Sequence, residues 1–288
     1  MFKVTSPGGL TLAADEAGAT SDPNVLLFHG GGQTRHAWGR AIQALAARHW
    51  HAVTFDLPGH GDSEWAPDGD YGLDIFSASV AGVARLYERP VLVGASLGGL
   101  AALAAIGQGL VPEAAGLVLV DITPRFEPAG VERIRNFMRQ GVDGFDSLEE
   151  VADAIATYVP NRQRPRNLTG LTKNVRQRDD GKWVWHWDPR FMSRIDEGTG
   201  EPTAGRYSGD RIRQSARNVK VPVLLVHGAS SDVVSPEGVA ELKELIPHAL
   251  AVDVAGAGHM VAGDRNDNFN NAVIDFLERV IRPQLAEG

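Results

Sequence analysis

The sequence predicts an α/β fold whose core is a mostly parallel β-sheet. Short runs rich in valine and leucine recur along the 288 residues, alanine-rich helical stretches separate them, and glycine, aspartate or histidine follows most of the runs. Repeated strand–helix units of this kind are typical of a parallel sheet. Ligands of such sheets bind beyond the carboxyl ends of the strands, so the residues that follow the runs are the first candidates for chemistry.

Six strands and four helices are expected in the core. The strands are expected over residues 25–28, 52–55, 91–93, 117–120, 223–226 and 251–254. Helices are expected over residues 35–48, 97–108, 236–245 and 268–281. The third helix has Ser235 as its N-cap and Pro236 in its first turn, and the fourth carries its apolar residues at helical spacing.

The segment between residues 121 and 221 has about 100 residues, far more than a connection between two strands of a sheet needs. We therefore expect one core in two segments, 1–121 and 217–288, with a cap inserted at 122–216. Within the cap, the alternating stretch DGKWVWHWDP puts three tryptophans on one face of a strand. Trp185 is expected to contact the substrate, and a small cap core is the alternative role for the three indoles.

Composition excludes several functional classes. With 43% hydrophobic and 22% charged residues the chain is typical of globular proteins, and its net charge of −8 gives no drive toward nucleic acid or anionic membranes. The absence of cysteine excludes disulfides, thiolate metal sites and a cysteine nucleophile. The amino terminus lacks the apolar region of a signal peptide, so a cytoplasmic location is expected. Nothing indicates the oligomeric state.

The uncharged stretch VLVGASLGGLAALAAIGQGLV, residues 91–111, predicts a reactive serine rather than a membrane span. It is long enough to cross a bilayer, but its glycines and alanines weaken a spanning helix. As a strand, a tight turn and a helix, it places Ser96 on the turn, where Gly94 and Gly98 remove side chains that would collide. The Leu97 amide at the helix start is then expected to donate a hydrogen bond to an oxyanion.

A serine nucleophile also needs a base, an acid that orients the base and a second oxyanion donor. The glycines of the HGGGQ loop leave amides free, so Gly31 is the expected donor and Gly32, beside it, is expected to contact the substrate. His259, which follows Gly256 and Gly258 in the loop after the last strand, is the expected base. Chain order favours Asp232 as the orienting acid, with Asp121 at the end of GLVLVD as the alternative.

The stretch TFDLPGHGDS raises the possibility of a metal site. Asp56 and His60 lie near a strand end, but a proline and two glycines shape the turn between them and just beyond, and no third ligand is near in the sequence. A structural turn is the favoured interpretation, and no metal is expected.

With serine, acid and histidine in this order, the chain resembles the α/β-hydrolase superfamily. Its HGGGQ, DLPGHG, LVLVDITP and WVW stretches are similar to those of bacterial carboxylesterases, among them a mycobacterial ester hydrolase. The resemblance implies an eight-stranded, mostly parallel sheet flanked by helices, a mainly helical cap after the sixth strand, no cofactor and an acyl-enzyme mechanism. Ser96, His259 and Asp232 carry over as nucleophile, base and acid, and Leu97 and Gly31 as oxyanion donors.

The expected function is hydrolysis of small-molecule carboxylic esters. Serine at the turn means acyl transfer, because relatives that form alkyl-enzyme esters use aspartate there. Four activities with the same triad stay open: enol-lactonase, hydrolase of carbon–carbon bonds, thioesterase and cofactor-free haloperoxidase. A non-catalytic protein that binds a small ligand is the alternative from another class.

Overall fold

The computed structural model describes residues 1–5, 9–158, 164, 167–192, 209–255, 258 and 267–287. Its main sheet has eight strands in the order β1-β2-β4-β3-β5-β6-β9-β10. β1 and β4 each pair with β2 antiparallel, and all the other neighbours are parallel. The strands are β1 (Phe2–Thr5), β2 (Thr11–Ala17), β3 (Asn24–Phe28), β4 (His51–Phe55), β5 (Val91–Ala95), β6 (Gly116–Val120), β9 (Val223–Gly228) and β10 (Leu250–Val254). The predicted fold class is confirmed.

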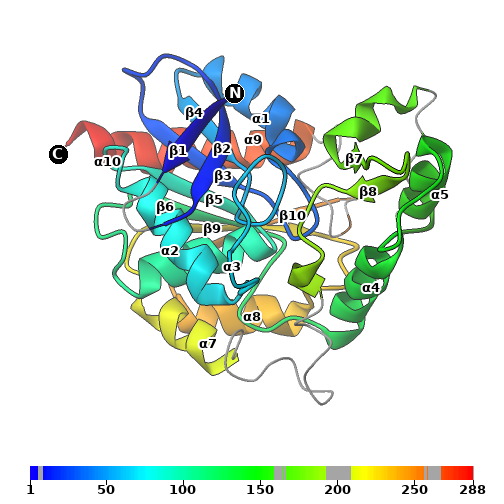
Figure 1. The fold of residues 1–288 in the computed structure, drawn as a ribbon. Helices are drawn as coiled ribbons and strands as arrows, with labels where there is room; N and C mark the ends of the chain where they lie inside the picture. Colours follow the sequence, from blue (N-terminus) through cyan, green and yellow to red (C-terminus); the bar gives the residue numbers. More distant parts are fainter. Residues whose placement is uncertain are drawn as a thin grey trace.

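Helices cover both faces of this sheet (Figure 1). Residues of α2, α3, α7 and α8 share one buried apolar cluster, and residues of α1, α9 and η3 share the other. The helical segments are η1 (Arg35–Trp38), α1 (Gly39–Ala46), α2 (Leu73–Ala84), α3 (Leu97–Gly107), α7 (Gly209–Asn218), α8 (Pro236–Leu245), α9 (Asp267–Phe276), the π-helical η3 (Leu277–Ile281) and α10 (Arg282–Ala286).

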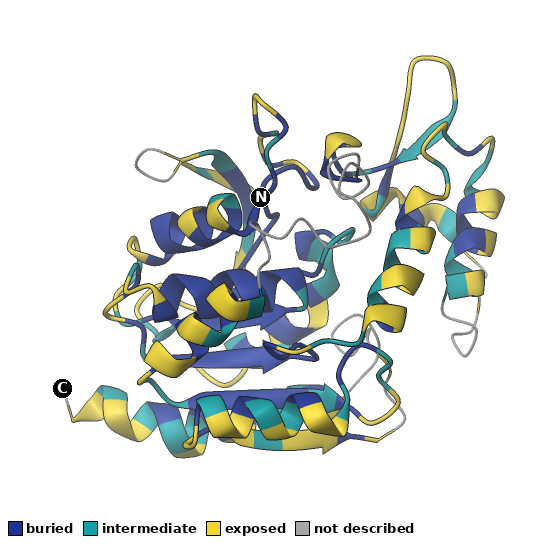
Figure 2. Cartoon of the chain, turned by 90° about the horizontal axis from the view of Figure 1, so that it is seen from below, coloured by how far each residue is buried: buried dark blue, intermediate teal, exposed yellow. Residues whose placement is uncertain are grey.

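The two clusters follow from the alternation of side chains along each strand. In β3, Val25 and Leu27 face the α1 and α9 side, whereas Leu26 and Phe28 face the α3 side. Because both faces are covered, β5 and β6 in the middle of the sheet contain only apolar residues and glycine, and all of these residues are buried. Figure 2 shows the central strands coloured as buried. Such a sheet is a rigid base for the loops at its carboxyl edge.

The segment after β6, where a cap is expected and which is called the cap, contains helices and a small sheet. It contains α4 (Pro128–Arg139), α5 (Leu148–Tyr158), the 3₁₀ helix η2 (Leu168–Lys173) and the antiparallel pair β7 (Val175–Gln177) and β8 (Trp183–Trp185). These elements lie together beside the core in Figure 1. The expected cap range, 122–216, also includes most of α7, but α7 packs on α3, since a Cβ at Gly107 would run into the backbone of Ser215.

Three local expectations differ from the structure. The helix expected over 35–48 begins as the 3₁₀ helix η1, and the one expected over 268–281 ends in the π-helical η3. β1, β2 and α2 were not located individually from the sequence. α8 does begin at Pro236, and Ser235 Oγ accepts a hydrogen bond from the Gly238 amide, 3.3 Å away, as an N-cap does.

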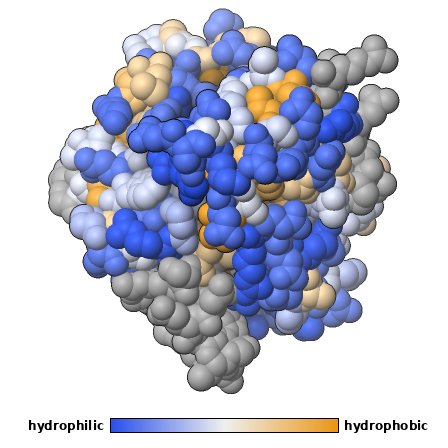
Figure 3. Space-filling model, turned by 45° about the vertical axis from the view of Figure 1, so that its right-hand side comes forward, coloured by the Kyte–Doolittle hydropathy of each residue, from blue (hydrophilic) through white to orange (hydrophobic). Residues whose placement is uncertain are grey.

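The surface seen in Figure 3 is mainly hydrophilic, with small, separate hydrophobic spots. Within the described residues, no helix combines the length and the apolarity needed to cross a bilayer. The prediction of a turn within residues 91–111 agrees with the structure, in which β5 ends at Ala95 and α3 begins at Leu97.

Candidate active site

Ser96 occupies a strained turn between β5 and α3. Its φ and ψ angles are 46° and −112°, a conformation that costs a non-glycine residue about 1–3 kcal/mol. From residue 91 through residue 107, all of which the structure describes, Ser96 is the one residue that is not buried. The turn therefore presents the serine side chain at the carboxyl edge of the sheet.

Glycines on both sides make this turn possible. A Cβ at Gly94 would run into the backbone of Gly98, and a Cβ at Gly98 would run into the carbonyl oxygen of Phe28 at the end of β3. The Gly98 amide donates to the carbonyl oxygen of His29, 3.2 Å away, which joins the turn to the neighbouring loop. Backbone packing thus brings Ser96 next to the HGGGQ loop.

The HGGGQ loop leaves one amide available beside Ser96. The Gly30 amide donates to Gln33 Oε1 at 3.0 Å, and the Gly32 amide donates to His60 Nε2 at 3.1 Å. Among the described residues, none accepts a hydrogen bond from the Gly31 or the Leu97 amide. A Cβ at Gly31 would lie 3.9 Å from the Leu97 side chain, so the two residues that carry these amides are close together in space.

Two buried histidines hold the loop in this shape. His29 Nε2 accepts from the Leu57 amide at 2.9 Å, and its Nδ1 lies 2.8 Å from the Gly30 carbonyl oxygen. His60 lies against it, with ring centroids 5.1 Å apart. Burial lowers the pKa of His29 to about 4 and that of His60 to about 3. Both rings are therefore neutral near pH 7 and serve as hydrogen-bond partners of the backbone.

Asp56 binds an arginine in this structure. Its carboxylate accepts from the Arg35 backbone amide at 2.6 Å and from the Arg35 guanidinium at 2.5 Å. The same guanidinium also pairs with Asp15 and Asp62, at 2.8 Å each. Arg35, which the sequence analysis did not identify, thus joins three acids beneath the glycine loop, and this role can be seen only in three dimensions.

His259 lies outside the described residues. Gly258, directly before it, is described, and a Cβ there would lie 3.8 Å from the carbonyl oxygen of Ser230 in the loop after β9. The preceding strand, β10, pairs in parallel with β9. The chain therefore approaches residue 259 from the β9 and β10 end of the sheet.

The two candidate acids have very different surroundings. Asp232 forms a bidentate ion pair with Arg133 of cap helix α4, at 2.6 and 2.8 Å, and the two side chains are 39% and 46% exposed. Asp121 is fully buried and accepts hydrogen bonds from the Gly228 amide at 2.9 Å and from Ser231 Oγ at 2.5 Å. The sequence analysis did not predict the ion pair between Asp232 and Arg133.

Asp121 also lies in line with Ser96 across the sheet. Ala95 of β5 pairs with Val120 of β6, so Ser96 and Asp121 are the next residues on two adjacent parallel strands. The Ser96 amide donates to the Val120 carbonyl oxygen at 3.1 Å, and Asp121 has a positive φ of 48°. Neighbouring strands are about 4.8 Å apart, which puts the two backbones close together.

Trp185 is part of the cap core. It is 6% exposed, its Nε1 donates to the Gln140 carbonyl oxygen at 2.6 Å, and it stacks on Trp187 with ring centroids 5.0 Å apart. The cap residues next to the glycine loop are Phe191 and Met138, whose side chains are nearest to added Cβ atoms at Gly31 and Gly32. The sequence analysis missed both, because neither belongs to a motif.

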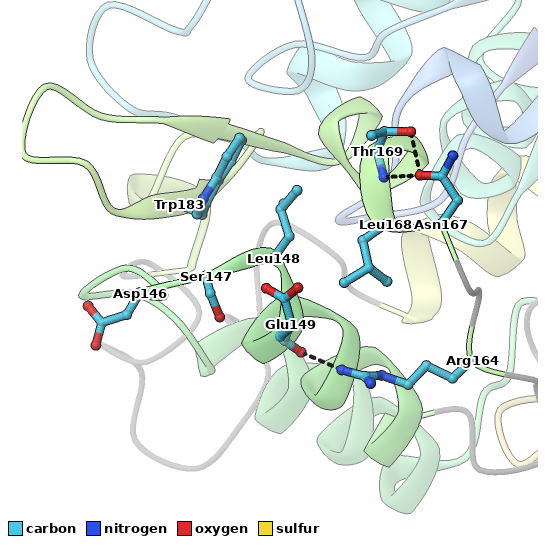
Figure 4. Close-up of a pocket in the computed structure, with 9 residues that line it drawn as sticks. All are labelled: Asp146, Ser147, Leu148, Glu149, Arg164, Asn167, Leu168, Thr169 and Trp183. Atoms are coloured by element: carbon cyan, nitrogen blue, oxygen red, sulfur yellow. Dashed lines mark hydrogen bonds between the residues drawn. The ribbon is translucent and has the colours of Figure 1, made fainter.

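A surface hollow of about 850 Å³ lies elsewhere in the cap (Figure 4). Its lining comes from the start of α5, from η2 and the residue before it, from Trp183 of β8 and from Arg164, which donates to the Glu149 carbonyl oxygen at 3.2 Å. Among the described lining residues, none is Ser96, Asp232 or Asp121. The serine turn, rather than this hollow, is the candidate active site.

Comparison with known proteins finds relatives that share the fold. The profile of a family described as alpha/beta hydrolase fold matches residues 23–265. Esterase Rv0045c of Mycobacterium tuberculosis is 33% identical over 271 residues, which cover 91% of this chain and 83% of the relative. The 3-hydroxybutyrate-oligomer hydrolase of Cupriavidus necator is 31% identical over 269 residues, covering 88% and 89%.

Solved structures show the same fold. A structure of the M. tuberculosis esterase superposes with a TM-score of 0.73 at 28% identity and covers 96% of this chain and 91% of that one. The structure of E-2-(acetamidomethylene)succinate hydrolase superposes with a TM-score of 0.79 at 24% identity, covering 93% and 96%.

Proposed function

The chain belongs to the α/β-hydrolase fold family, and from this premise we propose that it hydrolyses carboxylic esters of small molecules with Ser96 as the nucleophile. The observation that carries the proposal is the strained, partly exposed Ser96 beside the backbone amides of Leu97 and Gly31. Neither amide donates a hydrogen bond to a described residue. The relation to an esterase supports the choice of substrate class.

The proposed reaction has two steps. His259 takes the proton of Ser96, whose oxygen attacks the ester carbonyl carbon, and the amides of Leu97 and Gly31 stabilise the oxyanion. His259 then protonates the leaving alcohol, and a water molecule that it activates hydrolyses the acyl-enzyme. Gly31 is the better second donor than Gly32, because the Gly32 amide already donates to His60.

We propose Asp121 as the acid that orients His259, although chain order favours Asp232. A carboxylate that stabilises an imidazolium acts most strongly where it is buried and held in position. Asp121 is buried and hydrogen-bonded beside Ser96, whereas both oxygens of Asp232 contact Arg133 at the surface. Asp232 then serves to attach cap helix α4 to the loop after β9.

Labelling with a fluorophosphonate tests the nucleophile. The wild-type chain is expected to gain one phosphonyl group by intact mass and to hydrolyse p-nitrophenyl acetate. Ser96→Ala is expected to lose labelling and to reduce kcat/KM at least about 10³-fold without unfolding. Ser79→Ala, which alters a buried serine of α2, is the control and should keep both properties.

Two results with a chain that is active would contradict the proposal. One is near-normal turnover by Ser96→Ala of any ester that the wild type cleaves. The other is a wild-type chain that hydrolyses lactones or acyl thioesters but no simple ester, which would move the substrate class to one of the related activities. A chain that neither reacts nor labels would indicate a ligand-binding protein.

A further inference from the structure

Two apolar side chains of the segment after β6, those of Phe191 and Met138, cover the glycine loop and are called its roof. A Cβ at Gly31 would lie 3.7 Å from Phe191 Cζ, and a Cβ at Gly32 would lie 3.2 Å from Met138 Cε. Phe191 is 8% exposed and Met138 is 5% exposed, so both are packed into the interior. The backbone that offers the Gly31 amide is therefore covered by a phenyl ring and a thioether.

The Phe191 ring is held in place from several sides. It contacts His60 edge-on with ring centroids 5.1 Å apart, and Tyr71 and Phe76 at 5.9 and 6.1 Å. Rings packed in this way have little freedom to move aside.

The backbone around Phe191 is tied to the core. The Asp188 amide donates to the Gly59 carbonyl oxygen at 2.7 Å, and the Asp188 carboxylate accepts from the Tyr71 hydroxyl at 2.6 Å. The Phe191 amide donates to the Asp188 carbonyl oxygen at 3.0 Å. Phe191 is thus a fixed wall, whereas Met138, on helix α4 and with an unbranched side chain, adapts more easily.

The position of this roof identifies the part of the ester that meets it. The leaving oxygen must face the base, His259, because that residue protonates the alcohol. Gly258, directly before His259, lies near Ser230 in the loop after β9, so we expect the leaving oxygen on the β9 and β10 side of Ser96. The glycine loop follows β3, on the opposite side of β5 and Ser96. With the carbonyl oxygen between the two amides, the acyl substituent points toward the β3 side and the roof.

We infer that Phe191, with Met138 beside it, forms the wall of the acyl subsite and restricts the enzyme to short, uncharged acyl groups. This inference rests on the proposed ester hydrolysis at Ser96. Among the residues that the structure describes, the side chains nearest to the three glycines are Gln33, Ser96, Leu97, Phe191 and Met138, and none of these five carries a charge. A carboxylate on the acyl chain would lose its hydration against such a surface without gaining an ionic partner.

A series of p-nitrophenyl esters tests the inference, because the leaving group is constant and only the acyl chain changes. The measured quantity is the ratio of kcat/KM for octanoate to that for acetate, which reports acylation. The wild type is expected to favour acetate and butyrate. Phe191→Ala is expected to raise the octanoate-to-acetate ratio at least about tenfold, since a few methylenes in an apolar pocket change rates by that much.

The cap supplies a matched control. Phe145 is also 8% exposed and contacts Trp185 edge-on at 5.3 Å, within the cap core. Phe145→Ala should lower stability as any such truncation does, but leave the octanoate-to-acetate ratio within about twofold of wild type. Phe191→Leu, a smaller change for which folding is easier to keep, should raise the ratio in the same direction.

Charge is tested with a matched pair of esters. The wild type is expected to hydrolyse p-nitrophenyl pentanoate at least about tenfold faster than the mono-p-nitrophenyl ester of glutaric acid, which adds a carboxylate at the chain end. Similar rates for the two esters would overturn the uncharged part of the inference.

The inference and the proposed function fail in different ways. An unchanged chain-length ratio in both Phe191 variants, with wild-type labelling of Ser96, would overturn the acyl wall and leave the esterase proposal intact. Phe191 variants whose kcat/KM changes with the alcohol of the ester, but not with the length of its acyl chain, would also overturn it. Loss of all ester hydrolysis in the wild type would instead remove the proposed function and the inference with it.

Discussion

Replacing the two candidate acids separately gives the sharpest test of the proposed site. Asp121→Asn and Asp232→Asn each remove one negative charge and keep the shape of the side chain. If Asp121 orients His259, its replacement is expected to lower kcat by about 10³ to 10⁴, as loss of a triad aspartate does. Asp232→Asn removes an ion pair whose members are 39% and 46% exposed, which contributes only about 0–1 kcal/mol, so its effect on kcat/KM stays below about fivefold.

Stability separates a catalytic loss from an unfolded protein. Asp121 accepts hydrogen bonds from the Gly228 amide and Ser231 Oγ, and an asparagine keeps one carbonyl oxygen as acceptor. The cost in unfolding free energy is expected to be about 1–3 kcal/mol, which urea unfolding measures. Turnover that stays low well below the urea midpoint then comes from the site itself.

The pH profile gives a second measurement that a structural role would not change. A carboxylate next to His259 favours the imidazolium, so removing it is expected to lower the pKa of the base seen in kcat/KM. The reasoning is refuted if Asp232→Asn loses 10³-fold or more while Asp121→Asn stays near wild type. In that case the base contacts the loop acid, and the Arg133 pair must open during catalysis.

Two further predictions concern the serine turn and the buried histidines. Gly98→Ala is expected to abolish ester hydrolysis and lower the melting temperature, because its Cβ would run into the Phe28 carbonyl oxygen, whereas Gly39→Ala, with no heavy atom within 4 Å, should be stabilised by about 0.4–1 kcal/mol. A fully active Gly98→Ala would contradict the geometry of the turn. His29 and His60 have folded-state pKa values of about 4 and about 3, below the unfolded value of about 6.5, so the unfolded chain binds more protons as the pH falls and stability is lost from pH 6.5 downward. Urea unfolding should show a decrease of about 1.4 kcal/mol per pH unit for each ring, and His60→Gln should flatten this slope; a wild-type stability independent of pH between 6.5 and 5 would disprove the assignment.

The amino-acid sequence by itself determined six of the eight strands of the main sheet, the serine turn and the glycine loop. These features are local, because the side chains that specify them are neighbours in the chain. Valine-rich runs predict buried strands. Gly94 and Gly98 predict a turn so tight that a side chain at either position would collide with the backbone. The position of β5 and α3 around Ser96 follows directly from that pattern.

Only the tertiary structure decided which groups around the serine already form hydrogen bonds or ion pairs with other parts of the chain. The Gly31 and Gly32 amides look equivalent in the sequence, but His60, folded back from the next loop, binds only Gly32. The two aspartates likewise differ in their surroundings: Asp232 forms an ion pair with Arg133 of the cap, whereas Asp121 is buried between β6 and β9. Such contacts join residues far apart in the chain, so their hydrogen bonds, charges and solvent exposure exist only once the sheet and the cap have come together.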